Sequence, residues 1–401
     1  MNPEETALEI PSGFRAAGVR AGIKPSGLPD LAVLVADKTC SAAGTFTTNR
    51  VAAAPVLWDR AIVPSESVRA IVINAGNANA ATGALGFENT RRTAELAAQR
   101  LACQPEQILI ASTGVIGHQL PMDKLEAGLD AAWNQVTEEA SGFHDASEAI
   151  LTTDTRPKIL SKSLKLADGR RLRMLGLAKG AAMIGPRMAT MLGFLLTDAR
   201  VLPGALQGIL SDAVDSSFNC ISVEGHTSTN DSVLLLASGR DVPPLAGDDL
   251  KAFAGLVRET CRDLARMIPD DGEGATHLIT IDVEGCADTE QARAIARAVA
   301  DSPLVKTAIH GADPNWGRIV SAAGYAGVPF EESELSLSLN KTLIYREGAP
   351  IDFDAATLSS QMRQHREVDI RLSIKQGDTS IRFWTCDLTA EYIRLNADYT
   401  T

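Results

Sequence analysis

The chain has 401 residues, of which 45% are hydrophobic and 22% are charged, and 38 Lys+Arg against 50 Asp+Glu give a formal net charge of −12. This composition is typical of a globular protein with two or three domains, and it excludes disorder or a collagen-like repeat for the whole chain. The acidic balance argues against nucleic-acid binding, because a phosphate backbone attracts clustered Lys and Arg.

Short β-branched runs alternate along the chain with longer segments of helical periodicity. In chain order, the predicted elements are a strand at Val68–Asn74, a helix at Asn89–Cys103, strands at Ile108–Ala111 and Ser232–Ala237, a helix at Leu250–Ile268, a strand at His277–Val283 and a helix at Asp288–Ala300. The last helix begins with an aspartate, a residue type that often caps a helix N-terminus.

Near the end of the chain, Glu367–Ile374 and Thr379–Cys386 alternate polar and apolar residues around Gly377–Asp378. This pattern predicts a β-hairpin. Strands mixed with helices, some of them hairpin-paired, favour a layered α+β fold over a simple parallel sheet. We place a domain boundary near residue 275, after the Gly-rich stretch DDGEGAT.

The N-terminus has no basic stretch followed by an apolar core, so we expect no secretory signal. The longest strongly apolar stretches, such as Leu31–Ala36 and Met191–Leu196, are far shorter than the ~20 residues that span a bilayer. We therefore expect a cytoplasmic protein that does not bind membranes.

Cysteines and histidines are few and dispersed. No C-x-x-C pair or Cys/His cluster occurs, so we expect reduced thiols, no disulfide framework and no metal site. The six cysteines are Cys40, Cys103, Cys220, Cys261, Cys286 and Cys386.

The most unusual segment is KGAAMIGPRMATMLGFLLTDA, from Lys179 to Ala199. Its Gly185–Pro186 pair disfavours a continuous helix, so the backbone is expected to turn there and enter a strand after Thr190. In one interpretation this is a buried loop that leads into a core strand.

In the other interpretation, the hydroxyl of Thr190 attacks the preceding carbonyl and cuts the Ala189–Thr190 bond. The new α-amino group has an ordinary pKa of ~7.7–8.0. It can take the hydroxyl proton near neutral pH, so that nucleophile and base lie in one residue. Such an enzyme needs neither histidine nor metal, and the residues alone leave both interpretations open.

The same segment resembles the self-cleavage motif K-G-x-G-M-I-x-P-x-M-A-T-M-L of the ornithine acetyltransferases of arginine biosynthesis. The resemblance extends from about Pro11 to Thr401. The further motifs are GIK (22–24), FTTNRVAAAPV (46–56), NAGNANAATG (74–83), ASTGVIG (111–117), TTDTRPK (152–158), TSTND (227–231), DGEGAT (271–276), VKTAIHGADPNWGR (305–318) and YIRLNADYTT (392–401).

This resemblance implies roles residue by residue. Thr190 would be the nucleophile of both self-cleavage and acyl transfer, and Thr113 and Gly114 would form the oxyanion hole. Substrate would be bound by Thr152, Lys179, Thr190, Glu273, Asn396 and Thr401. Lys179 would hold a substrate carboxylate, and Glu273 would suit the ammonium of ornithine.

The resemblance also implies a fold, a reaction and an assembly. The fold would be a self-cleaving α/β/β/α-type sandwich (1–275) with a smaller C-terminal α+β domain (276–401) whose tail returns to the site. N2-acetylornithine would acetylate Thr190, and L-glutamate would then take the acetyl group. No cofactor would be needed, and two α chains (1–189) and two β chains (190–401) would form a heterotetramer.

Three alternatives remain at this point. The same enzyme could also use acetyl-CoA as donor to make N-acetylglutamate. A related self-cleaving amidase or aminopeptidase would hydrolyse its substrate instead of transferring the acyl group. An uncleaved binding or structural protein would use Thr190 only as a core residue.

Overall fold

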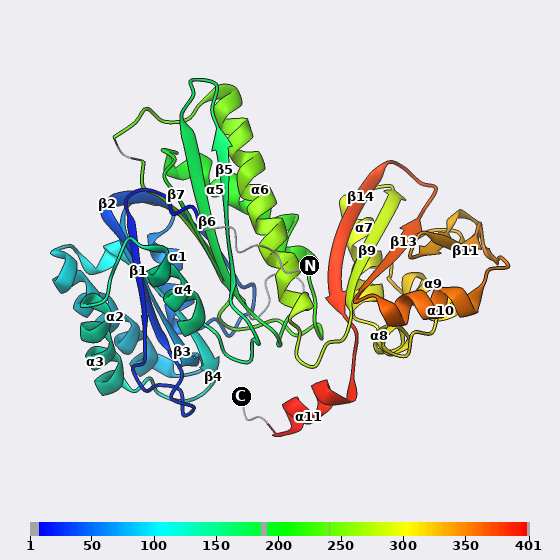
Figure 1. The fold of residues 1–401 in the computed structure, drawn as a ribbon, viewed down its shortest axis with the longest axis horizontal. Coiled ribbons are helices and arrows are strands. Elements are labelled where there is room, and N and C mark those ends of the chain that lie inside the picture. The colour runs from blue at the N-terminus through cyan, green and yellow to red at the C-terminus, as the bar shows by residue number, and fades with distance from the viewer. Residues whose placement is uncertain (1–7, 186–190, 240, 399–401) are drawn as a thin grey trace.

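The computed structural model describes residues 8–185, 191–239 and 241–398, which form two sheets flanked by helices (Figure 1). The first sheet has eight strands in the order β4-β3-β2-β8-β7-β6-β5, and β1 pairs with β2 beside this path. Its strands are β1 (Phe14–Val19), β2 (Leu31–Phe46), β3 (Ser65–Asn77), β4 (Ile108–Val115), β5 (Lys158–Lys165), β6 (Arg171–Lys179), β7 (Leu192–Thr197) and β8 (Ser232–Ala237).

The long strand β2 connects the two halves of this sheet. Its first part, Leu31–Ala36, pairs with β1 on one side and with β3 on the other. Its last part, Ser41–Phe46, pairs with β8 in place of β1, while the pairing with β3 continues to Ala42. One strand therefore belongs to both halves.

Alternation along β2 allows the sheet halves to pack on each other. Leu31, Val33 and Val35 face one apolar layer, shared with buried residues of α2 (Gly83–Leu101) and α3 (Met122–Trp133). Ala32 and Leu34 face a second layer, which buried residues of β6, β7 and β8 complete. Period-two alternation thus gives β2 two apolar faces.

A third apolar layer lies on the other side of β6–β8, under α5 (Pro203–Asp215) and α6 (Gly247–Asp270). In this part of the chain the order of layers is helices, one half of the first sheet, its other half, and helices. This is the predicted sandwich. The remaining helices of this part are α1 (Ala54–Ile62) and α4 (Ala140–Ala149).

The second sheet has the order β12-β11-β10-β13-β9-β14 and forms the smaller lobe in Figure 1. Its strands are β9 (Leu278–Cys286), β10 (Ser336–Leu339), β11 (Thr342–Arg346), β12 (Ala349–Pro350), β13 (Glu367–Ser373) and β14 (Thr379–Cys386). Its helices are α7 (Thr289–Ala300), α8 (Pro303–His310), α9 (Trp316–Gly324) and α10 (Ala355–Gln364), and α11 (Ala390–Asp398) then leads back toward the first sheet.

The predicted hairpin of the last two strands is wrong. Strand β9 lies between them, parallel to β13 and antiparallel to β14. Their connection crosses the end of β9, where Gly285 has φ +75° and Gly377 packs on the Cys286 carbonyl. A Cβ at Gly285 would lie 2.0 Å from the Ile374 carbonyl oxygen. The two glycines permit a crossing that strand alternation alone does not reveal.

Most predicted elements occur in the structure, with shifted ends. Asp288 caps α7, because its carboxylate accepts the Gln291 amide at 2.8 Å. Helix α2 begins at Gly83, earlier than the predicted Asn89. All six cysteines lie in the described part of the chain, and none of them forms a disulfide there. The domain division near residue 275 stays a prediction.

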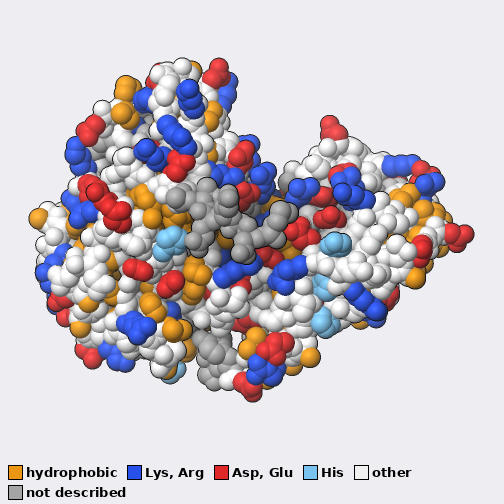
Figure 2. All heavy atoms as spheres, in the orientation of Figure 1, with side chains coloured by type: hydrophobic (Ala, Val, Ile, Leu, Met, Phe, Trp, Pro, Cys, Tyr) orange, Lys and Arg blue, Asp and Glu red, His pale blue; other side chains and the backbone are white. Residues whose placement is uncertain are grey.

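The described part of the chain contains no helix long and apolar enough to cross a membrane. On the face drawn in Figure 2, basic and acidic side chains are interspersed over both lobes.

Close packing of α6 on β6 gives a test of the fold. A Cβ at Gly176 would lie 2.6 Å from Leu264 Cδ1 and 3.0 Å from Thr260 Cγ2, whereas one at Gly255 would meet nothing within 4 Å. Gly176→Ala should lower the free energy of unfolding by about 1–3 kcal/mol because both neighbours are buried. Gly255→Ala, inside α6, should raise it by about 0.5–1 kcal/mol. Urea unfolding measures both, and equal effects would contradict the packing described.

Candidate active site

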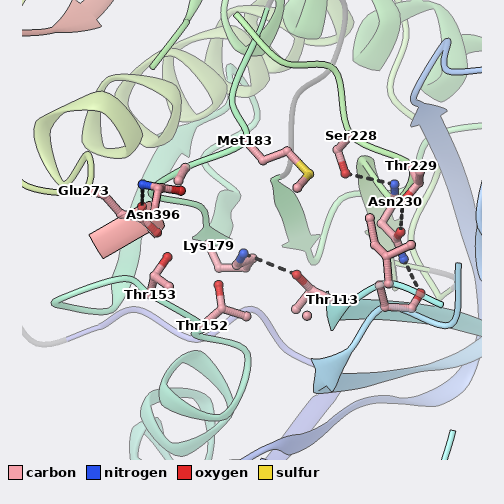
Figure 3. A pocket seen from close by; sticks show the side chains of 14 residues that line it. Thr113, Thr152, Thr153, Lys179, Met183, Ser228, Thr229, Asn230, Glu273 and Asn396 are labelled. Atoms are coloured by element: carbon pink, nitrogen blue, oxygen red, sulfur yellow. Dashed lines mark hydrogen bonds between the residues drawn. The ribbon is translucent and has the colours of Figure 1, made fainter. Parts of the chain in front are cut away.

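Six residues singled out in the sequence line one pocket, shown in Figure 3. They come from five separate parts of the chain and are Thr113, Gly114, Thr152, Lys179, Glu273 and Asn396. Ala189, Thr190 and Thr401 lie outside the described residues. The structure therefore brings six predicted site residues together, while their individual roles stay predictions.

The end of β4 supplies Thr113 and Gly114. This strand pairs in parallel with β3, so that Gly114 lies opposite Gly76. Gly114 has φ +130°, and a Cβ there would lie 2.3 Å from the Gly76 carbonyl carbon. Only glycine fits this close approach of two backbones, which accounts for the glycine in the STG segment independently of any chemistry.

Lys179 ends β6 with its ammonium group inside the protein. The side chain is 1% exposed, and Nζ donates to Thr113 Oγ1 at 3.3 Å. Burial lowers the pKa of Lys179, while the nearby charges of Asp154, Asp231 and Glu273 oppose that shift. Asp154 and Glu273 are the carboxylates that allow Lys179 to act as a cation at the pocket wall in spite of its burial.

A second buried lysine, Lys158, holds the loops around the pocket. Its Nζ lies 2.7 Å from Asp154 Oδ1 and 2.6 Å from Asp271 Oδ2, and Lys158 and Asp154 have no exposed side-chain surface. Asp154 Oδ1 also accepts the Gly180 amide at 2.6 Å. Burial alone would raise the pKa of Asp154, but the charges of Lys179 and Lys158 hold it well below its usual range. The network thus connects three places in the fold, which are the start of β5, the loop between α6 and β9, and the end of β6.

Glu273 and Asn396 meet across the pocket. The Asn396 side-chain amide, on α11, donates to Glu273 Oε2 at 2.7 Å. Thr389 Oγ1 donates to the Gly274 carbonyl at 2.9 Å and so attaches the beginning of α11 to the same turn. Asp387 accepts the amides of Thr276 and His277, at 2.8 and 2.9 Å. These bonds fix the turn that carries Glu273.

Several residues of the site were not identified from the sequence. Asn230 lines the pocket, and its amide group donates to the carbonyls of Ala78 and Ser112 at 2.6 and 2.8 Å, which ties the ends of β3 and β4 together. Asp154, Lys158 and Asn230 all lie in segments that carry the resemblance, TTDTRPK and TSTND. Their position in those motifs was the sequence feature that could have identified them, but the motifs do not indicate which residues they contact.

No group of three or more His, Cys, Asp or Glu side chains that could hold a metal ion occurs among the residues that the structure describes.

Removal of the Lys158 charge should be costly. Lys158→Met leaves Asp154 and Asp271 buried without their partner, which should lower the free energy of unfolding by about 3–5 kcal/mol. Because the pKa of Asp154 is depressed in the folded state, this contribution is present above the ordinary aspartate pKa and is lost as the pH falls. The difference from wild type should therefore narrow below about pH 4.

Lys162→Met is the matched control on the same strand. Lys162 pairs with Asp263 at 2.6 Å, but both side chains are partly exposed, so its loss should cost no more than about 1 kcal/mol. Urea unfolding at neutral pH measures both variants. Equal decreases in the free energy of unfolding would show that the buried ion pairs of Lys158 stabilise the fold no more than a surface ion pair does.

Comparison with known proteins identifies the family of the chain. A curated protein from Rhodopirellula baltica, named arginine biosynthesis bifunctional protein ArgJ, is 43% identical over 404 residues, covering 100% of this chain and 98% of its own. One of the same name from Thermus thermophilus is 47% identical over 398 residues, covering 98% of this chain and 100% of its own.

The crystal structure of arginine biosynthesis bifunctional protein ArgJ from Bacillus halodurans is 38% identical, with a TM-score of 0.51, and covers 52% of this chain and 100% of its own. The family model described as ArgJ family matches residues 15–401. The chain belongs to the ArgJ family.

Proposed function

We propose that this chain transfers the acetyl group of N2-acetylornithine to L-glutamate through an ester on Thr190, after self-cleavage at Ala189–Thr190. The observation that carries the proposal is the convergence of Thr113, Gly114 and Lys179 beside the start of β7. Leu192 pairs with Lys179 in the register of β6 and β7, and residue 190 precedes Leu192 by two positions. The relatives' names place the reaction in arginine biosynthesis.

Thr113 is suited to stabilise an oxyanion. Its hydroxyl accepts a hydrogen bond from Lys179, so the hydroxyl hydrogen is available for a second partner. A charged donor also polarises the hydroxyl and strengthens the bond that it makes. Together with Gly114, it offers uncharged donors at the place where a tetrahedral intermediate would develop negative charge.

Charges around the pocket fit amino-acid substrates. Lys179 provides one buried cation for a substrate carboxylate, and Glu273 provides one carboxylate for the ammonium of ornithine. Asn396 orients Glu273 through their 2.7 Å hydrogen bond. After ornithine leaves the acetyl ester, glutamate would occupy the same site, which explains how one pocket serves both half-reactions. Thr152 lines the same pocket, and Thr401 would complete it from the C-terminal tail.

The proposal extends to processing and assembly. Cleavage would give chains 1–189 and 190–401, and two copies of each would form a cytoplasmic heterotetramer. The first chain would supply Thr113, Gly114 and Lys179, and the second would supply Thr190 and Glu273. No cofactor is required, and acetyl-CoA would enter only as an alternative acetyl donor.

Intact mass tests the nucleophile. Wild-type protein should give two fragments, the second beginning at Thr190, whereas Thr190→Ala should stay whole and inactive because it has no hydroxyl to attack the Ala189 carbonyl. Thr197→Ala, at the end of strand β7, removes a buried hydroxyl that bonds to the Arg173 carbonyl and should still be cut. Cleavage of Thr190→Ala at the same bond would refute the assignment.

Product analysis on the same preparations separates transfer from hydrolysis. With acetylornithine and glutamate the wild type should give N-acetylglutamate. Mainly free acetate in the presence of glutamate would instead support an amidase. Replacing acetylornithine with acetyl-CoA shows whether the second donor is used.

Lys179→Met should weaken substrate binding. Loss of a buried cation that pairs with a substrate carboxylate should raise KM, and loss of the charged donor to Thr113 should lower kcat, so that kcat/KM falls by about 100-fold or more. Lys24→Met is the control, because Lys24 is half-buried near Lys179 but bonds to the Pro29 and Ala149 carbonyls and does not line the pocket. Its KM should stay within about threefold of wild type, a change of less than 1 kcal/mol. Equal KM values in Lys179→Met and wild type would remove Lys179 from the binding site.

A further inference from the structure

Asp231 presents a buried carboxyl group next to the proposed nucleophile. It precedes β8, and it is 0% exposed. Its Oδ1 atom accepts the backbone amide of Met191 at 3.0 Å. Met191 follows Thr190 directly in the chain. One carboxyl oxygen of Asp231 is therefore fixed one residue beyond the proposed cleavage point.

The second oxygen, Oδ2, is buried and has no hydrogen-bond partner in the described part of the structure. A buried acceptor without a partner costs free energy, and most proteins avoid it. In this chain the same pattern occurs at Asp59, whose Oδ1 accepts the Ile110 amide at 2.8 Å and whose Oδ2 also has no partner. Asp59 bonds to the middle of β4, whereas Asp231 bonds to the residue after the proposed cut.

Charge around Asp231 is sparse. Lys179, on β6, is the charged group whose field reaches the carboxyl. The hydroxyls of Thr47 and Ser228 lie close enough to lower its pKa, but neither donates to Oδ2 with hydrogen-bond geometry. The Lys179 ammonium, however, bonds to Thr113, and the Thr47 hydroxyl donates to the Ser228 carbonyl at 2.6 Å. Burial raises the pKa of Asp231 well above its usual range, and these groups only partly oppose the shift. The uncut chain thus favours a neutral Asp231.

We propose that the Asp231 carboxyl pairs with the amino group that cleavage releases at residue 190. The inference rests on the proposed function, since it requires a free Thr190. Backbone bond lengths set the nitrogens of adjacent residues roughly 3 Å apart. A carboxylate that accepts the Met191 amide with one oxygen can therefore reach the neighbouring amine with the other. Cleavage would supply the partner that Oδ2 lacks.

This pairing would serve the reaction in two ways. Before cleavage, Asp231 holds the chain just beyond the scissile bond. After cleavage, the pair shares a proton and orients the amine that must act as base toward the threonine hydroxyl. A carboxylate beside an amine raises the pKa of the amine, and the two groups then titrate as a coupled pair.

The pH profile of the cleaved enzyme tests the pairing. Asp231→Asn keeps the size of the side chain and an acceptor for Met191 but cannot share a proton. Since the amine must lose its proton to act as base, the acid limb of kcat/KM should move to lower pH by about one unit or more. Asp59→Asn, with the same local pattern away from the cut, should leave the acid limb unchanged.

Infrared spectroscopy provides a second test that does not depend on Asp231→Asn being cut or folding. Carbon-13 labelling of aspartate distinguishes aspartic acid bands from those of glutamic acid. In the uncut Thr190→Ala chain, both Asp231 and Asp59 should contribute a protonated carboxyl band at neutral pH. In cleaved wild type the Asp231 contribution should disappear and the Asp59 contribution should remain.

Two results would overturn the inference while leaving the proposed function intact. One is an Asp231→Asn enzyme that is cut and keeps the wild-type acid limb. The other is an aspartic acid band that does not change between the uncut and the cleaved chain. Cleavage of Thr190→Ala would instead remove the proposed function itself, so the two failures are distinguishable.

Discussion

The geometry of the pocket depends on one buried ammonium group, that of Lys158. It lies between Asp154 and Asp271, which come from segments more than one hundred residues apart. Desolvation of three ionised groups is costly, and their mutual attraction offsets that cost only if the geometry is kept. The requirement for charge compensation therefore helps to fix the loops that carry Thr152, Gly180 and Glu273 relative to one another.

That network also shapes the field in which Lys179 works. The chain carries a net charge of −12, yet Lys158 and Lys179 are buried at or beside the pocket, and Lys24 is half-buried near Lys179. Burial lowers the pKa of Lys24 to about 8. Each of the three is kept inside by nearby carboxylates or carbonyls. Because Asp154 and Asp271 compensate Lys158, Lys179 is the buried cation that an acidic protein can offer to an acidic substrate, which responds to local charge.

Sequence reasoning succeeded where a residue type has one dominant use. Asp288 was expected to cap a helix and does so. Six residues from separate motifs line one pocket, while their roles in catalysis and binding stay predictions. These predictions depended on local chemistry or on the resemblance, and neither requires knowledge of the strand order.

Predictions from the sequence failed where the structure depends on the spatial order of the strands or on the burial of a polar side chain. The alternation of β13 and β14 is compatible with a hairpin, and only the crossing at Gly285 and Gly377 reveals that β9 separates them. Asp154, Lys158 and Asp231 are ordinary polar residues in the sequence. Their importance comes from the removal of water around them, which no pattern of residue types expresses.

The register of β14 on β9 sets the position of α11 relative to the pocket. Cys386 lies opposite Leu278, so β14 ends where β9 begins, close to the turn that carries Glu273. Sliding β14 by two residues would keep its buried face but move the start of α11 by nearly 7 Å, and Asn396 would lose contact with Glu273. The register irregularity of this pair lies at the opposite end, between Thr379 and Ile381. Changes in strand length can therefore be absorbed away from the site, while the distance between the sheet and Asn396 stays constant.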